Sequence, residues 1–223
     1  MYVHEVSKEI ADLFVREKHY SRRQGFFRKA FGLMEHGCVV GTAVFGEPPL
    51  QVVKHCFTDR TFPLLELVRV VVQTDTKNAA SFLIGNSLKL LDQPSAVVSY
   101  ADSSWGHCGI IYQATNWFFC GSTVSHDSLY LVNGERIHPR TLAARGITNP
   151  KQWAKDNGIE TIAPSPKHRY VYLCGNKYHK RDMLAKLKWP IHPDYPKTEK
   201  SRYDDGPRLV VSAPIDLLGR DLA

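Results

Sequence analysis

The sequence predicts an α/β (α+β) fold in which helices flank a mixed central sheet, and three observations carry this prediction. The run Leu64–Val72 is rich in β-forming residues, as a buried central strand is. A helical pattern at 78–91 separates it from a second short apolar stretch at 96–98. The 223 residues suffice for a full core. We expect one domain with an elaboration, with two small domains as the alternative.

The first expected element is a helix that Ser7 can cap and that ends near His19. Its apolar residues Ile10, Leu13 and Phe14 share one face at helical spacing. We therefore expect these three side chains to be buried against the sheet.

A hairpin follows, with strands at 29–33 and 39–45. The strands meet in a turn where Gly37 accommodates a positive φ. The adjacent Pro48 and Pro49 exclude a central strand directly after the hairpin.

The middle of the chain alternates between helices and strands. After the central strand, the helix at 78–91 turns four apolar residues toward the core, namely Phe82, Leu83, Leu88 and Leu91. Strands at 95–100 and 120–124 then flank a helix at 109–118. This order places the second buried strand beside the first.

We divide the chain into three parts. Residues 1–125 form the core, and residues 126–166, rich in glycine, proline and charge around a helix at 150–157, form an inserted lobe. Residues 167–223 complete the same domain as a basic C-terminal extension. They contain a strand at Lys167–Cys174, a basic helix at 180–188 and an irregular tail from Pro190.

Composition narrows the class of protein. The five cysteines are odd in number and form no CxxC pair, which favours reduced thiols over a disulfide framework or a structural zinc site. No stretch approaches the roughly 20 apolar residues that span a bilayer, and the first residues lack the apolar core of a signal peptide. We expect an intracellular protein that does not enter a membrane.

The net charge of +7 comes from 29 basic and 22 acidic residues. Basic and aromatic residues gather between 167 and 188, which is typical of contact with a phosphate backbone. A solvated helix face is the alternative reading of the same charges.

Residues 99–117, SYADSSWGHCGIIYQATNW, follow the second buried strand. A strand that runs into a polar turn and then a helix presents side chains and backbone N–H groups at the carboxyl end of the sheet, where ligands bind in open α/β folds. Asp102 is the first candidate for handling a proton, and a helix N-cap is its alternative role.

Arg69 interrupts an apolar strand, and a buried guanidinium requires a partner. The partner is Glu66 if the pair is structural, or a phosphate or carboxylate ligand if it is not. Regular alternation would point Glu66 and Arg69 to opposite faces, which disfavours that pair.

The order of elements resembles the GNAT acyltransferase fold, whose two central strands splay apart to admit acyl-CoA. More specific blocks are HYS at 19–21, AFGL at 30–33, ELVRV at 66–70, SYAD at 99–102, GHCGIIYQA at 106–114 and IHPRTL at 137–142. Together they resemble the Mom family of phage DNA-modification proteins over roughly residues 10 to 190.

The resemblance implies a phage-encoded transferase in the cytoplasm of the host bacterium. It would convert adenine in double-stranded DNA to N6-carbamoylmethyladenine and so protect phage DNA from host restriction. An ordinary GNAT N-acyltransferase acting on a small-molecule or protein amine is the alternative, and a non-catalytic DNA-binding protein is a third reading. The donor of the carbamoylmethyl group and the oligomeric state stay unassigned.

The resemblance and the residue chemistry together nominate four sets of site residues. The catalytic candidates are Asp102, His19, Tyr20, Ser99 and Tyr112. The candidates for binding acyl-CoA (acetyl-CoA) are Arg69, Val70, Val72, Lys77, Asn78 and Ala79, although TKNAA at 76–80 stands where GNAT proteins carry a glycine-rich pyrophosphate signature. The candidates for iron, a metal linked to this family, are His19, Asp102, His107 and Cys108. The DNA-binding candidates are Arg22, Arg23, Arg136, His138, Arg140, Lys167, Arg169, Lys180 and Arg181.

An adenine paired inside a duplex cannot present its N6 amine to a deep pocket, so extrusion of the base is expected. Trp105, Trp117 and Tyr100 are candidates to stack on it, and Trp117 fits a core position as well.

Overall fold

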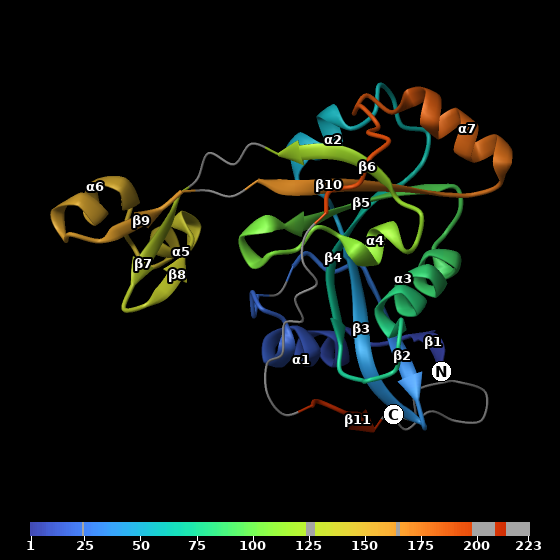
Figure 1. Ribbon diagram of the computed structural model, residues 1–223, viewed down its shortest axis with the longest axis horizontal. Helices are drawn as coiled ribbons and strands as arrows, with labels where there is room; N and C mark the ends of the chain where they lie inside the picture. The colour runs from blue at the N-terminus through green and yellow to red at the C-terminus, as the bar shows by residue number, and fades with distance from the viewer. Residues whose placement is uncertain (24, 124–127, 164–165, 198–207, 213–223) are drawn as a thin grey trace.

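The computed structural model describes residues 1–23, 25–123, 128–163, 166–197 and 208–212. The strands of its main sheet are β1 (Tyr2–Glu5), β2 (Lys29–Glu35), β3 (Cys38–Gly46), β4 (Leu64–Val72), β5 (Ser95–Asp102), β6 (Phe118–Thr123), β10 (Lys167–Cys174) and β11 (Val211–Ser212). The helices beside it are α1 (Lys8–Lys18), α2 (Leu50–His55), α3 (Ala79–Leu90), α4 (Ile110–Gln113) and α7 (Lys177–Lys186), with the short 3-10 helix η1 (Ser103–Trp105). A mixed sheet flanked by helices is therefore confirmed (Figure 1).

The strand order is β1-β2-β3-β4-β5-β10-β6, with β11 against β3. Among the strands of the described residues, only β4 and β5 run parallel, and they pair over three positions, from Leu64 opposite Ala96 to Glu66 opposite Val98. Beyond Glu66, β4 continues to Val72 with no β5 partner in that register. The two central strands therefore diverge, as the resemblance to the GNAT fold implies, and a gap opens at their carboxyl ends.

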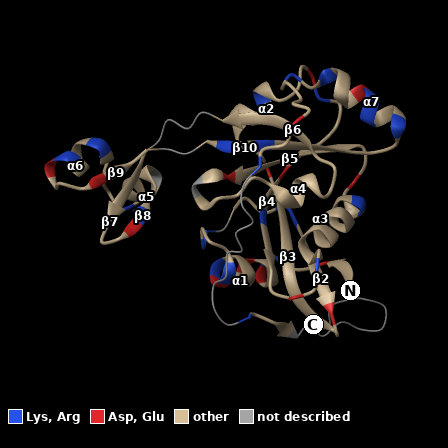
Figure 2. Ribbon diagram, in the orientation of Figure 1, with Lys and Arg blue, Asp and Glu red and all other residues tan. Residues whose placement is uncertain are grey.

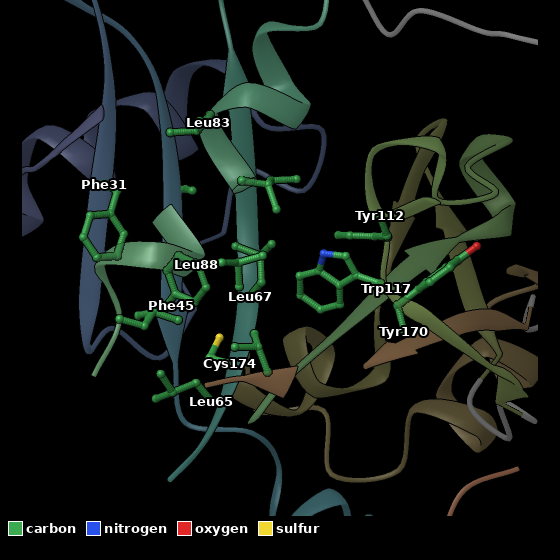
Figure 3. Packing of buried hydrophobic residues seen from close by; sticks show 14 of the residues in the cluster. Phe31, Phe45, Leu65, Leu67, Leu83, Leu88, Tyr112, Trp117, Tyr170 and Cys174 are labelled. Atoms are coloured by element: carbon green, nitrogen blue, oxygen red, sulfur yellow. The ribbon is translucent and has the colours of Figure 1, made fainter. Parts of the chain in front are cut away.

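Helices α1 and α3 cover opposite faces of the β1–β4 half of the sheet. Alternate residues of β2 and β3 belong to two separate apolar clusters, one with Phe14 of α1 and one with Leu83 of α3. Such alternation is what a strand covered on both faces requires. The cluster under α3 extends past the divergence to Tyr112, Trp117 and Tyr170, which Figure 3 shows packed together.

A β-bulge interrupts β4 at Val68. The pairing with β3 passes from Val44 opposite Arg69 to Phe45 opposite Leu67, so Val68 has no opposite residue. One extra residue reverses the alternation of side chains between the faces. Glu66 and Arg69 therefore share a face, and the expectation that they point apart is wrong.

Several element boundaries differ from the sequence prediction. Helix α4 ends at Gln113 instead of reaching 118, because Asn116 adopts a positive φ and Phe118 begins β6. Strand β1 and helix α2 are additional. Two expected core residues, Leu13 and Phe82, are 40% and 36% exposed, because α1 and α3 turn Ala11, Val15 and Ile84 inward instead. The expected strand end at 124 lies outside the described residues.

The lobe that follows β6 has its own sheet, ordered β8-β7-β9. Its elements are β7 (Leu129–Val132), β8 (Glu135–Ile137), α5 (Pro139–Ala144), α6 (Pro150–Asp156) and β9 (Glu160–Ile162). Tyr130, Ile137, Leu142 and Ala154 form a small separate core there. Figure 1 shows the lobe at one end of the long axis and α7 at the other.

The basic C-terminal extension is described in part. Residues 190–197 run along the sheet without regular structure, and Tyr195 donates its hydroxyl to the carbonyl of Trp117 at 2.8 Å. Residues 198–207 and 213–223 of the predicted tail lie outside the described residues. Within the described part of the chain, no helix combines the length and apolarity needed to span a bilayer.

Candidate functional site

A cavity of about 310 Å³ lies where β4 and β5 diverge. Four parts of the chain line it: the end of α1 with the residues after it, the second half of β4, the end of β5, and the segment that leads into α4. These lining residues are 18–20, 68, 70–73, 100–101 and 106–112. The volume is in the range of small-molecule sites, so the gap between the strands can hold a ligand group.

His19 and Tyr20, which follow directly after α1, line the cavity. Both are among the site residues predicted from the sequence. The N–H of Ser21 donates to Nδ1 of His19 at 3.1 Å, so that nitrogen carries no proton and Nε2 is the donor of the neutral ring. Burial, with the nearby charges of Arg69 and His107, lowers the pKa of His19 to about 3. His19 is therefore a neutral hydrogen-bond donor at pH 7.

Asp102 does not line the cavity but is the last residue of β5, next to the lining residue Ala101. Its carboxylate is 15% exposed and lies 3.6 Å from Nζ of Lys167. Its charge affects two residues that line the cavity. Burial and the charge of Asp102 both raise the pKa of Tyr20. Burial lowers the pKa of His107, and the charge of Asp102 partly offsets that effect. The ring of His107 meets that of Tyr20 edge-on at 5.4 Å.

Ser99 and Tyr112 are both buried and bond to each other. The Ser99 hydroxyl donates to the carbonyl of Leu67 at 2.8 Å and lies 2.8 Å from the Tyr112 hydroxyl. Leu67 is the first residue of β4 beyond its pairing with β5, so Ser99 satisfies a carbonyl that the divergence leaves free. Tyr112 lines the cavity, and burial raises its pKa above the ordinary value.

Arg69 bonds to the backbone of its surroundings: its guanidinium donates to the carbonyls of Arg23 at 3.1 Å and Val68 at 2.7 Å. Glu66 lies on the same face, and burial raises its pKa to about 7 despite the opposing charges of Arg69 and Lys167. From the sequence, Glu66 was predicted only as a possible partner of Arg69. Its position at the divergence of β4 and β5 makes it a titrating group beside the site.

Among the residues predicted to bind acyl-CoA, Val70 and Val72 line the cavity, whereas Lys77, Asn78 and Ala79 do not. A carboxylate lies beside the chain before α3. The Glu35 carboxylate accepts hydrogen bonds at 2.7 Å from the hydroxyls of Thr74 and Thr76, and these bonds lower its pKa. A diphosphate at the start of α3 would lie beside this negative charge.

The four candidate iron ligands do not form a metal site. Among the described residues, no group of three or more His, Cys, Asp or Glu side chains is arranged to hold a metal ion. In addition, Nδ1 of His19 already accepts from Ser21, and the proton on Nε2 would have to leave before a metal could bind there.

The DNA-binding candidates fall into three places. Arg22 and Arg23 follow His19, and Arg23 donates to the hydroxyl of Thr141 in the lobe, which also carries Arg136, His138 and Arg140. Lys180 and Arg181 are on α7, at the far end of the molecule from the lobe (Figure 2). Lys167 begins β10 beside Asp102, whereas Arg169 is half-buried, 4.7 Å from the ring of Trp189. The expected DNA-facing residues are therefore not on one surface.

Fold and site together define an α/β protein with a ligand-sized cavity between two diverging central strands. Residues 1–197 match the Mom protein family, and the chain belongs to that family. It is 28% identical over 208 residues to Methylcarbamoylase mom of Escherichia phage Mu, an alignment that covers 87% of this chain and 83% of that protein.

The chain also shows a limited structural similarity to solved acetyltransferases. A GNAT-family acetyltransferase from Bacillus cereus ATCC 10987 gives a TM-score of 0.43 at 10% identity, over 78% of this chain and 98% of that one. An N-acetyltransferase from Staphylococcus aureus Mu50 gives 0.43 at 14% identity, with the same two coverages.

Proposed function

We propose that this protein is a transferase that modifies the exocyclic N6 amine of adenine in double-stranded DNA, with N6-carbamoylmethyladenine as the product. The family membership and the similarity to Methylcarbamoylase mom support this proposal. The observation that carries it is the cavity between β4 and β5, lined by His19, Tyr20 and His107, with the Asp102 carboxylate behind them. By the same argument the protein acts on phage DNA inside the host bacterium.

The reaction requires that one proton be removed from the N6 amine. The N6 amine forms a bond to the transferred carbon of the donor, the bond between that carbon and the rest of the donor breaks and its electron pair leaves with the departing part, and a proton leaves the nitrogen. His107 lines the cavity, and burial keeps its pKa below the ordinary value, so its neutral ring can accept this proton. The Asp102 carboxylate then stabilises the imidazolium, which makes Asp102 a positioning residue rather than a group in contact with the base.

The neutral His19 has a complementary role. Because its Nδ1 is occupied by Ser21, the Nε2–H group is the one free to donate to an acceptor atom in the cavity. A nitrogen of the adenine ring or an oxygen of the transferred amide is such an acceptor. This donor would orient the reacting groups without exchanging a proton itself.

The alternative function is an ordinary N-acyltransferase that uses acyl-CoA on a small-molecule or protein amine. The carboxylate of Glu35 at the start of α3 disfavours it, because the diphosphate of acyl-CoA would meet like charge there. Such an enzyme would bind acyl-CoA tightly and ignore DNA.

A restriction assay tests the proposed function in cells. Plasmid DNA from cells that express the chain should resist restriction enzymes whose recognition sites contain adenine, whereas plasmid from cells expressing the Asp102→Asn variant should be cut. Full cutting of the first plasmid, from cells that contain folded protein, would contradict the proposal.

We predict that the DNA path follows the lobe rather than α7, because the cavity adjoins the residues that contact the lobe. Replacing Arg22 and the exposed lobe residue Arg145 by Ala should lower the slope of log affinity against log salt by about two units, since each phosphate contact contributes about one. Replacing Lys180 and Arg181 removes the same charge at the remote end and should leave the slope nearly unchanged. Filter-binding titrations over a salt series measure both, and equal losses in the two pairs would refute this path.

A further inference from the structure

One aromatic wall runs from the inside of the cavity to the surface. The rings of His19 and Tyr20 lie 4.2 Å apart, and the ring of Trp105 is 5.1 Å from that of Tyr20. Trp105 belongs to η1, directly after β5, and is 38% exposed. The indole therefore lies at the outer end of a series of rings that leads to the cavity.

The lobe supplies a cation at the same place. The guanidinium carbon of Arg136, in β8, lies 5.8 Å from the centre of the Trp105 ring. This contact joins the lobe to the core beside the cavity, as the bond from Arg23 to Thr141 also does. Two planar groups from different parts of the chain thus lie against each other, next to the cavity-lining Tyr20.

Aromatic rings and guanidinium groups both bind nucleic acid bases in proteins. Unpaired bases stack on aromatic side chains and on guanidinium planes, and each stacked base strengthens binding whatever its sequence. An adenine that must reach a cavity has to leave the duplex stack, and it needs a replacement surface outside the helix. Trp105 and Arg136 supply that surface at the start of the aromatic wall.

We propose that Trp105 and Arg136 form a clamp that stacks the extruded adenine at the entrance of the cavity. The proposal rests on the proposed function in that it takes DNA as the substrate. It assigns the lobe a part in selecting an extruded base in addition to contacting the phosphate backbone. Trp105 is a positioning residue in this account, because the reacting amine lies deeper, near His107.

Intrinsic tryptophan fluorescence tests the clamp directly, because the other three tryptophans are placed differently. Trp117 is fully buried, Trp153 packs in the core of the lobe, and Trp189 lies against Arg169. The full chain is titrated with a duplex in which one adenine faces an abasic site and is easily extruded. The control duplex has an abasic site in place of that adenine as well.

We expect the first duplex to quench the fluorescence and the control duplex to quench it much less. Trp105→Ala should abolish this difference and weaken binding of the first duplex by about tenfold or more, measured by anisotropy of a labelled strand. Trp153→Phe, the matched control, should keep both. Arg136→Lys should bind no better than Arg136→Ala, because Lys restores the charge but not the plane.

Three results would overturn the clamp. If Trp105→Ala keeps the adenine-dependent quenching and affinity, the Trp105–Arg136 contact only joins the lobe to the core. If Arg136→Lys restores binding, Arg136 is a phosphate contact. In both cases the proposed function stands, whereas a wild-type protein that binds neither duplex would overturn the clamp and the proposed function together.

Discussion

Replacing Asp102 by Asn is expected to lower adenine modification by about a hundredfold or more, while the protein stays folded. The substitution keeps the size of a side chain that is 15% exposed, and it removes the negative charge that faces His107. Without that charge the imidazolium of His107 loses its stabilising neighbour. The acidic limb of the pH–rate profile should also move to lower pH, because Asp102 raises the pKa of His107.

The shift of the pH–rate profile distinguishes two roles of Asp102, namely stabilising the His107 imidazolium and forming an ion pair with Lys167. Rates measured between pH 5 and pH 8, with melting temperatures recorded alongside, distinguish a loss of proton transfer from a loss of folding. Lys167→Met removes the cation that lies 3.6 Å from the carboxylate and serves as the matched control for the ion pair. Unchanged activity in Asp102→Asn would reduce Asp102 to a partner of Lys167.

Glu66→Gln is expected to stabilise the protein at pH 8 and to have little effect at pH 4.5. Burial raises the pKa of Glu66 from 4.5 to about 7, so the folded state disfavours the ionised carboxylate that the unfolded state prefers. This penalty is absent below pH 4.5, grows as pH rises and is complete above pH 7. A shift of that size corresponds to about 3 kcal/mol, and the amide avoids it at every pH.

Thermal unfolding of Glu66→Gln and the parent protein at the two pH values measures this difference. Glu35→Gln is a control of opposite sign, because its hydrogen bonds to Thr74 and Thr76 lower the pKa of Glu35. That variant should lose stability at pH 8 and not at low pH. If Glu66→Gln changes the melting temperature equally at both pH values, the pKa of Glu66 does not differ between the folded and unfolded states, which would contradict this prediction.

The pattern of apolar residues in the sequence predicted the strands that lie inside the sheet. Leu64–Val72 and Lys167–Cys174 have the predicted bounds, because each is rich in β-forming residues and lies inside the sheet. The capping of α1 by Ser7 was equally visible in sequence. Leu13 shows the limit of the method: it matches the helical spacing, but the rotation of α1 on the sheet turns Ala11 and Val15 inward instead.

The candidate site was predictable in its location and less so in its roles. The segment after β5 and the pair His19-Tyr20 converge on one cavity, as predicted. Two features depend on three-dimensional geometry that no spacing encodes: the bulge at Val68, which brings Glu66 and Arg69 to one face, and the approach of Arg136 to Trp105. The position of α7 far from the lobe could not be predicted either, because a run of basic residues in the sequence does not show where in the fold it will lie.

The central claim is that this protein modifies adenine in DNA, and mass spectrometry of nucleosides tests it most directly. DNA from cells expressing the parent chain, and in parallel the Asp102→Asn variant, is digested to nucleosides and separated. The account predicts a deoxyadenosine whose N6 carries a carbamoylmethyl group in place of one hydrogen, present with the parent chain and strongly reduced with the variant. Unmodified deoxyadenosine alone, from cells that contain the folded parent protein, would contradict it.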